Sequence, residues 1–227
     1  MGVYLSRFIF QCSSINNFLH DARGLLSVDD PIFKRNFGLK TSVHYLKEMV
    51  IETGKEIAFQ RGWKQAFAKI KPNLSDTREK QFEVYFRRLK NDGDDLYYSR
   101  CFAIKYIGKN VGYGVFAKED IPSYSTLGHY MGMYRLDKEI DPNNDCTFTF
   151  HPFKLFSIDA KTCGNWTRFM NHAEKGSINV RAWEFYTKES PFIVFTSGSR
   201  GIKKGEQLLY SYGDDYWHED SFTTLKL

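Results

Sequence analysis

The sequence predicts an α+β protein, with a helical N-terminal region at residues 1–95 and a β-rich domain at residues 96–227. In the first half, apolar residues recur every three to four positions, as they do on one face of a helix. The second half has short runs rich in β-branched and aromatic residues, divided by turn residues. The polar stretch NDGDD at residues 91–95 marks the expected boundary.

The helical region contains one long repeat, residues 41–70, and a shorter apolar stripe that we expect to pack in the core. Gly54 and Gly62 are expected to break the long repeat into shorter helices. Its apolar positions are Val43, Leu46, Met49, Val50 and Ile57. The stripe consists of Phe82, Tyr85, Phe86 and Leu89.

The β-rich domain contains a series of candidate strands with no long helical period between them. Regular alternation of strands and helices is missing, which disfavours a doubly wound nucleotide-binding sheet. The candidate strands are residues 101–108, 112–117, 125–132, 146–159, 192–197 and 207–213.

Composition places the chain among globular proteins, with 42% hydrophobic and 26% charged residues in a length of 227. No apolar run approaches the roughly 20 residues that a membrane helix needs, so we expect a soluble protein. The four cysteines, Cys12, Cys101, Cys146 and Cys163, form no C-x-x-C pair, and the six histidines are scattered. We therefore expect no metal site, and free thiols in a reducing compartment.

The net charge of +5 lies in the first half of the chain. Residues 1–100 carry 17 Lys and Arg against 12 Asp and Glu, whereas residues 101–227 carry 15 of each. Such an excess can attract an acidic partner such as nucleic acid or a nucleosomal surface. The alternative is a solvated helical surface, because no dense Lys/Arg cluster is present.

Three stretches of the second half are interpreted together. Taken singly, each has a structural interpretation: a hairpin with glycines at its turns, a buried Asn-His pair, and an aromatic strand. The stretches are VGYGVFAKEDIPSYSTLGHYMG at 111–132, GNWTRFMNHAEKGSIN at 164–179 and GIKKGEQLLYSYGDDYW at 201–217.

In this order and spacing the stretches resemble the SET domain of protein-lysine methyltransferases, from about Ile107 to Trp217. The layout around VGYGVFA and SYGDDYW is most similar to bacterial SET proteins of the chlamydial nuclear-effector type. The resemblance implies small curved sheets and a C-terminal pseudoknot that brings residues 112–114, 168–172 and 210–217 together. It also implies S-adenosylmethionine in one pocket, S-adenosylhomocysteine as product, and a lysine entering from the opposite side.

The resemblance assigns three tyrosines to the lysine side. Tyr212 is the expected catalytic tyrosine at the point of methyl transfer, and Tyr130 lines the lysine channel. Tyr210 stands where the family carries Tyr or Phe, and its extra hydroxyl predicts mono- or di-methylation. A phenol suits this site because it hydrogen-bonds an amine without adding a full charge.

The cofactor side draws on all three stretches. Glycines allow close backbone approach, and Asn171 and His172 are expected to contact the cofactor. Arg168 is expected either to hold the cofactor carboxylate or, as we favour, to brace the pseudoknot. Trp217 is either an adenine-stacking residue or a core residue. The candidate cofactor-binding residues are Gly112, Tyr113, Gly114, Arg168, Asn171, His172 and Trp217.

Three positions depart from the family pattern. His129 replaces the usual glutamate before the channel tyrosine, and Ala173 replaces the usual serine. The next asparagine, Asn179, comes two residues late. These departures put the loop after His172 in question.

The expected function is S-adenosylmethionine-dependent methylation of a protein lysine, with a basic protein such as a histone as substrate. The N-terminal half would position that partner, contact chromatin or mediate a homodimer. The expected location is a host-cell nucleus after secretion, or otherwise the cytoplasm. The alternatives are a catalytically weak SET-like binding module and a basic nucleic-acid-binding protein with an unrelated β-domain.

Overall fold

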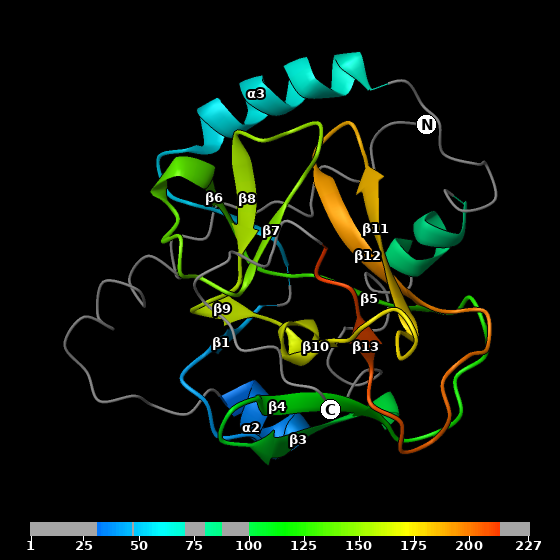
Figure 1. Cartoon of the computed structure of the whole chain (residues 1–227). Helices are drawn as coiled ribbons and strands as arrows, with labels where there is room; N and C mark the ends of the chain where they lie inside the picture. Colours follow the sequence, from blue (N-terminus) through cyan, green and yellow to red (C-terminus); the bar gives the residue numbers. More distant parts are fainter. Residues whose placement is uncertain (1–30, 47, 71–79, 88–99, 214–227) are drawn as a thin grey trace.

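The computed structural model describes residues 31–213 except 47, 71–79 and 88–99. Within these residues the strands form five small sheets, and the helices lie on their outside (Figure 1). This arrangement confirms the α+β class. The predictions for Trp217 and Leu89 lie outside the described residues.

The first described segment contains α2 (Pro31–Phe37), β1 (His44–Tyr45), β2 (Val50–Ile51) and α3 (Glu56–Lys69), and residues 80–87 are also helical. Seven strands and a 3-10 turn follow: β3 (Phe102–Gly108), β4 (Gly112–Ala117), β5 (Thr126–His129), β6 (Met133–Leu136), η1 (Asp137–Glu139), β7 (Thr147–Thr149), β8 (Phe156–Asp159) and β9 (Cys163–Gly164). The last elements are η2 (Trp166–Phe169), β10 (Asn171–His172), β11 (Val180–Tyr186), β12 (Pro191–Ser197) and β13 (Leu209–Tyr210).

Two of the sheets enclose most of the core. One has the strand order β2-β6-β8-β7 and the other β11-β12-β5. Helix α3 covers the first sheet, where the Phe59 ring lies 4.6 Å from the ring of Tyr134 and 5.2 Å from that of Phe156 (Figure 1). All three side chains are fully buried, so this contact fixes α3 on the sheet.

The prediction of a helical repeat from residue 41 is wrong for its first part. Residues 44–45 and 50–51 are strands that pair in parallel with β9 and β6, respectively. Tyr45, Val50 and Ile51 are buried between elements, as β-branched and aromatic residues commonly are in strands. Non-local pairing thus outweighs the local three-to-four spacing, and the helix begins only at Glu56.

The apolar stripe of the first half packs as expected. Phe82 and Phe86, in the helical residues 80–87, lie 5.3 Å and 5.8 Å from the ring of Phe185 in β11. Strands β1 and β2 likewise join sheets built from later residues. The division at residue 95 stays a prediction, but the first segment contributes structure to the second.

Strands β10 and β13 join segments that lie far apart in sequence. They pair in parallel, with Asn171 opposite Leu209 and His172 opposite Tyr210. This pairing lies near the centre of the molecule, between the β3–β4 hairpin and the larger sheets (Figure 1). Among the described residues no helix is long and apolar enough to cross a membrane.

Candidate functional site

Tyr212 is held by three contacts to the segment around β10. Its backbone N–H donates to Nδ1 of His172 over 3.1 Å, and its hydroxyl donates to the carbonyl oxygen of Met170 over 2.8 Å. The rings of His172 and Tyr212 lie 5.4 Å apart. Because His172 accepts at Nδ1 and burial lowers its pKa, the neutral imidazole carries its proton at Nε2.

Five aromatic side chains form a continuous cluster around this point, which we call the aromatic cluster. The ring of Tyr210 lies 4.8 Å from that of Tyr212, 5.1 Å from Phe195 and 6.3 Å from Phe148. Tyr130 closes the cluster, 5.3 Å from Phe148 and 6.4 Å from Phe195. Three of the five belong to the predicted lysine side: Tyr130, Tyr210 and Tyr212.

The aromatic cluster is an apolar environment with phenol groups. Tyr130 is 3% and Tyr210 6% exposed, and burial raises the pKa of Tyr130 well above its usual range. An amine entering such surroundings would favour its neutral form, because desolvation penalises the ammonium. The ring faces would also attract a cationic methylammonium group.

The glycine hairpin meets the Asn-His strand directly. Asn171 Nδ2 donates to the carbonyl oxygen of Tyr113 over 2.9 Å. Gly112 has a φ of 77°, a left-handed value that favours glycine. A Cβ on Gly114 would lie 2.6 Å from Gln207 Nε2 and 3.1 Å from Asn171 Nδ2, so only glycine fits this approach without displacing a neighbour.

Arg168 makes the contacts of a brace. Its Nε donates to the carbonyl oxygen of Ala160 over 2.7 Å, and Nη2 lies 3.2 Å from the sulfur of Cys146. Its guanidinium also lies 4.7 Å from the ring centre of Phe169. These contacts tie the Asn-His segment to the loop before β7, which leads to Phe148.

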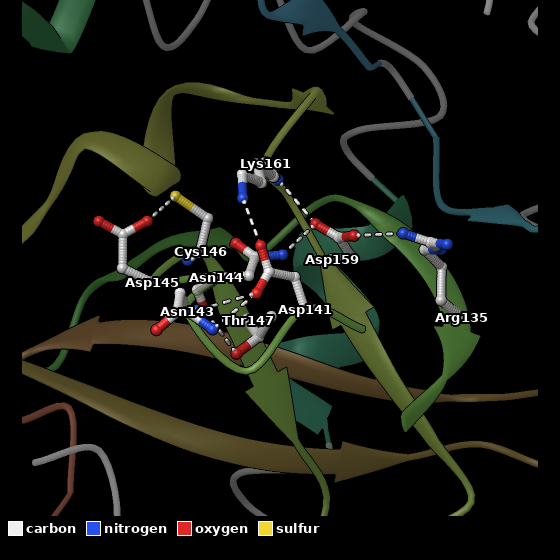
Figure 2. A network of polar contacts seen from close by, with 9 residues as sticks. All are labelled: Arg135, Asp141, Asn143, Asn144, Asp145, Cys146, Thr147, Asp159 and Lys161. Carbon is white, nitrogen blue, oxygen red and sulfur yellow. Dashed lines mark hydrogen bonds and ion pairs between the residues drawn. The ribbon is translucent and has the colours of Figure 1, made fainter. Parts of the chain in front are cut away.

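Asp159 anchors that loop to the sheet (Figure 2). Its carboxylate accepts from Arg135 Nη1 over 3.1 Å, Asn144 Nδ2 over 2.8 Å and the backbone N–H of Lys161 over 2.9 Å. Asp159 is only 6% exposed, and a buried carboxylate is stable there because these donors satisfy it. Asp159 thereby fixes the start of β7 beside the aromatic cluster.

Residues 112–213 match the model of the SET domain family. This segment is similar to SET domains. The match spans the glycine hairpin, the Asn-His strand and the tyrosines of the aromatic cluster, the same three stretches that carry the resemblance in the sequence.

Curated relatives of the chain are histone-lysine N-methyltransferases. EHMT1 of Homo sapiens is 32% identical over 118 residues, covering 49% of this chain and 9% of the relative. EZH2 of Chaetomium thermophilum is 31% identical over 118 residues, covering 46% of this chain and 8% of the relative. This chain therefore matches less than a tenth of the length of either relative.

A solved structure of ATXR5, in complex with histone H3.1 mono-methylated on R26, resembles this chain more broadly. It aligns with a TM-score of 0.58 and 18% identity, covering 78% of this chain and 83% of the ATXR5 chain. At this identity the similarity shows the fold alone. The similarity in fold extends beyond the segment that matches the SET domain model.

The matched segment brings most of the predicted site residues together. Residues 112–114, 168–172 and 210–212 are linked by the contacts above, whereas Trp217 lies outside the described residues. Sequence reasoning missed Phe148 and Phe195 as parts of the aromatic cluster. The alternating aromatics of CTFTFHPF, residues 146–153, were the available signal for Phe148.

The late asparagine after the Asn-His pair hydrogen-bonds to the segment at the start of β13. Asn179 Nδ2 donates to the carbonyl oxygen of Gln207 over 2.8 Å, and its Oδ1 accepts from the backbone N–H of Leu209 over 2.9 Å. The backbone N–H of Ala173 donates to the carbonyl oxygen of Tyr210 over 3.1 Å. The altered loop therefore still fastens β13 beside β10.

His129, which replaces the expected glutamate, pairs with the N-terminal segment. Its Nδ1 lies 2.9 Å from the hydroxyl of Tyr85, and the pair is buried. Burial lowers the pKa of His129 from 6.5 to about 3, so the side chain is neutral near pH 7. Tyr85 therefore donates to His129, and residues 80–87 help to position the end of β5, which Tyr130 directly follows.

We expect His129 to make folding sensitive to acid. The unfolded imidazole titrates near 6.5 and the folded one near 3, so the unfolded chain binds more protons between these values. The stability that the folded protein has because His129 is neutral is fully present above pH 6.5, and it is lost as the pH falls. From pH 7 to 5 the free energy of unfolding should fall by about 2 kcal/mol more in wild type than in His129→Gln.

Urea titrations at the two pH values measure this difference. Tyr85→Phe is the matched control, because it removes the hydrogen bond at a cost of about 1 kcal/mol but keeps His129 buried. It should retain the pH dependence of the wild type. An equal loss of stability in wild type and His129→Gln would show that His129 does not titrate on unfolding.

Proposed function

We propose that this protein is an S-adenosylmethionine-dependent protein-lysine methyltransferase. The observation that carries the proposal is the contact of the aromatic cluster with the Asn-His strand, which itself meets the glycine hairpin. One side of this arrangement suits a lysine side chain and the other a small-molecule cofactor. The SET domain match and the histone-lysine N-methyltransferase relatives support the same activity.

The residues at the glycine hairpin fit S-adenosylmethionine. Gly114 has no side chain, and amide nitrogens of Gln207 and Asn171 border the position that its Cβ would occupy. Such donors suit the carboxylate of an amino acid. Gly112, Tyr113, Gly114, Asn171 and His172 would hold the cofactor. When bound, it supplies a methyl group on a positively charged sulfur. Arg168 would act as a brace rather than as a direct contact, since Ala160 and Cys146 already occupy its guanidinium.

The aromatic cluster prepares the lysine for attack. Its amine must lose a proton, because the free pKa of lysine is about 10.4 and only the neutral form is nucleophilic. Burial among Tyr130, Phe148 and Phe195 favours that loss. The Tyr212 hydroxyl, fixed to Met170, sets the orientation of the tyrosine ring at the transfer point. Alignment of amine and methyl group then contributes much of the rate.

The substrate, the pseudoknot, the partners and the cellular location are part of this proposal. Relatives named as histone-lysine N-methyltransferases, and the ATXR5 structure with histone H3.1, support a histone as substrate. The parallel pairing of β10 and β13 supports a pseudoknot. A chromatin contact or homodimer through the N-terminal half is supported by its excess of positive charge. A bacterial effector acting in a host nucleus rests on the VGYGVFA and SYGDDYW layout alone.

A methyl-transfer assay tests the proposed activity. Purified protein is incubated with radiolabelled S-adenosylmethionine and core histones, linker histone or no added substrate. Transfer to a lysine, located by mass spectrometry, is the expected result. Cofactor binding in calorimetry without transfer to any of these proteins would instead favour a SET-like binding module.

We expect Tyr210→Phe to raise the degree of methylation. The Tyr210 ring lies 4.8 Å from that of Tyr212 within the buried cluster, so its hydroxyl takes space that a methylated amine would need. Wild type should yield mainly mono- and di-methyl-lysine, and the variant a several-fold larger trimethyl fraction. Mass spectrometry of a lysine peptide measures the distribution. Abundant trimethyl-lysine from wild type would contradict the assignment.

A further inference from the structure

Four exposed cations lie on α3 and on the two segments that pack against it. Arg61 and Lys64 lie on the helix, while Lys154 precedes β8 and Lys188 lies in the turn between β11 and β12. All four are exposed. We call these four residues the basic surface. Two of them come from the half of the chain that is neutral by composition, so the charge pattern of the sequence does not reveal the surface.

Trp63 joins the three segments that carry these cations. Its indole Nε1 donates to the carbonyl oxygen of Thr187 over 3.0 Å, and its ring lies 5.4 Å from that of Phe153. Thr187 and Phe153 directly precede Lys188 and Lys154 in the sequence. A Cβ on Gly62 would lie 2.9 Å from Leu155, so the helix packs closely on this loop. The three segments therefore meet at one turn of α3.

The basic surface carries an excess of charge. Among the ion pairs of the described residues, none involves any of its four cations. Of the described acids, Glu56 lies in the first turn of α3, Glu189 adjoins Lys188, and Glu184 already binds the ring of His151. Positive potential thus remains available to an external anion.

We propose that the basic surface binds the phosphate backbone of duplex DNA without sequence preference. Its cations come from a helix, a loop and a turn, which suits contacts to several successive phosphates. Among the described residues, the large apolar side chains exposed near it are Ile57 and Leu155, whereas the rings of Phe67 and Tyr186 pack on Trp63 and are partly buried. The described part of the surface therefore offers no fully exposed ring for the stacking that single strands use, and little apolar area for a membrane contact.

This surface is distinct from the proposed methyl-transfer site. Helix α3 lies on the outer side of the β2-β6-β8-β7 sheet, away from β10 and β13 (Figure 1). Bound DNA would leave the aromatic cluster open to a protein substrate. DNA binding would then hold the enzyme on chromatin while the lysine enters elsewhere.

Fluorescence anisotropy with a labelled 30-base-pair duplex of mixed sequence tests the proposal, at KCl concentrations from 50 to 200 mM. We expect the variant Arg61→Ala/Lys64→Ala/Lys154→Ala/Lys188→Ala to raise Kd at least tenfold at 50 mM. The slope of log K against log salt should fall by about 3 to 4, since each lost phosphate contact removes about 0.9. Circular dichroism and Tm establish that the variant is folded.

The matched control removes the same formal charge elsewhere. Lys40→Ala/Lys109→Ala/Lys175→Ala/Arg181→Ala changes four exposed cations on other elements and should alter Kd less than threefold. An equal loss of DNA affinity in both variants would overturn the proposal, because the net charge of the protein would then explain the binding. Absence of DNA binding by wild type, or tighter binding to phosphatidylserine vesicles than to DNA, would also overturn it. None of these outcomes bears on methyl transfer, which is measured separately.

Discussion

The Tyr212→Phe variant is expected to lose methyl transfer by about 100-fold or more, the size of effect seen when one preorganised hydrogen-bonding group is removed from an active site. The hydroxyl donates to the carbonyl oxygen of Met170 over 2.8 Å, which fixes the ring against the Asn-His strand. Without it, the tyrosine ring loses its fixed orientation, and the proposed transfer point loses a polar group. Initial rates on a lysine peptide measure the loss.

Cofactor affinity distinguishes this role from a general structural one. The backbone N–H of Tyr212 donates to His172, and the substitution leaves that bond in place. Calorimetry with S-adenosylhomocysteine should therefore give a Kd within about threefold of wild type. Tyr124→Phe, a change at a side chain that is 58% exposed, is the control and should keep full activity. Equal rates for wild type and Tyr212→Phe would remove Tyr212 from its assigned role.

Several strands of the second half, such as β3, β4 and β12, follow from local patterns of apolar and turn residues. Strands β6 and β11 are not among the candidate strands, and the candidate at 146–159 forms two strands, β7 and β8. The segment 41–51 shows where such reasoning fails. Val43, Leu46, Met49 and Val50 have helical spacing, yet their burial comes from elements more than 80 residues away. The spacing of apolar residues indicates only that they recur at intervals. Whether a helix or a strand buries them depends on the partner strand.

Prediction of the site from the sequence is limited in a similar way. The order of the glycine, Asn-His and tyrosine stretches suffices to predict that they meet, because a family pattern carries that information. The contacts of His129 with Tyr85 and of Tyr210 with Phe148 do not follow from that order. Tyr85 lies outside the matched residues, and Phe148 reaches Tyr210 only because Asp159 holds the loop before β7. Such contacts depend on the three-dimensional arrangement of loops, which a single sequence does not specify.

The Gly132→Ala variant is expected to lower the free energy of unfolding by about 3 kcal/mol, at the upper end for overpacking. An added Cβ would lie 2.5 Å from the carbonyl oxygen of Asp159 and 2.7 Å from Cγ2 of Ile158. The first contact is with backbone, which cannot rotate away as a side chain can. Relief would require β6 and β8 to separate where Met133 pairs with Asp159.

The damage should reach the site as well, because Asp159 anchors the loop that leads to Phe148 (Figure 2). Urea unfolding at pH 7 measures the loss as a lower midpoint at constant m value. Gly176→Ala is the matched control: its Cβ would meet no heavy atom within 4 Å, and its backbone is not left-handed. The control should change stability by about 0.5 kcal/mol or less. Similar midpoints for both variants would show that β6 and β8 can part at Gly132, and that this close approach does not hold Phe148 in the aromatic cluster.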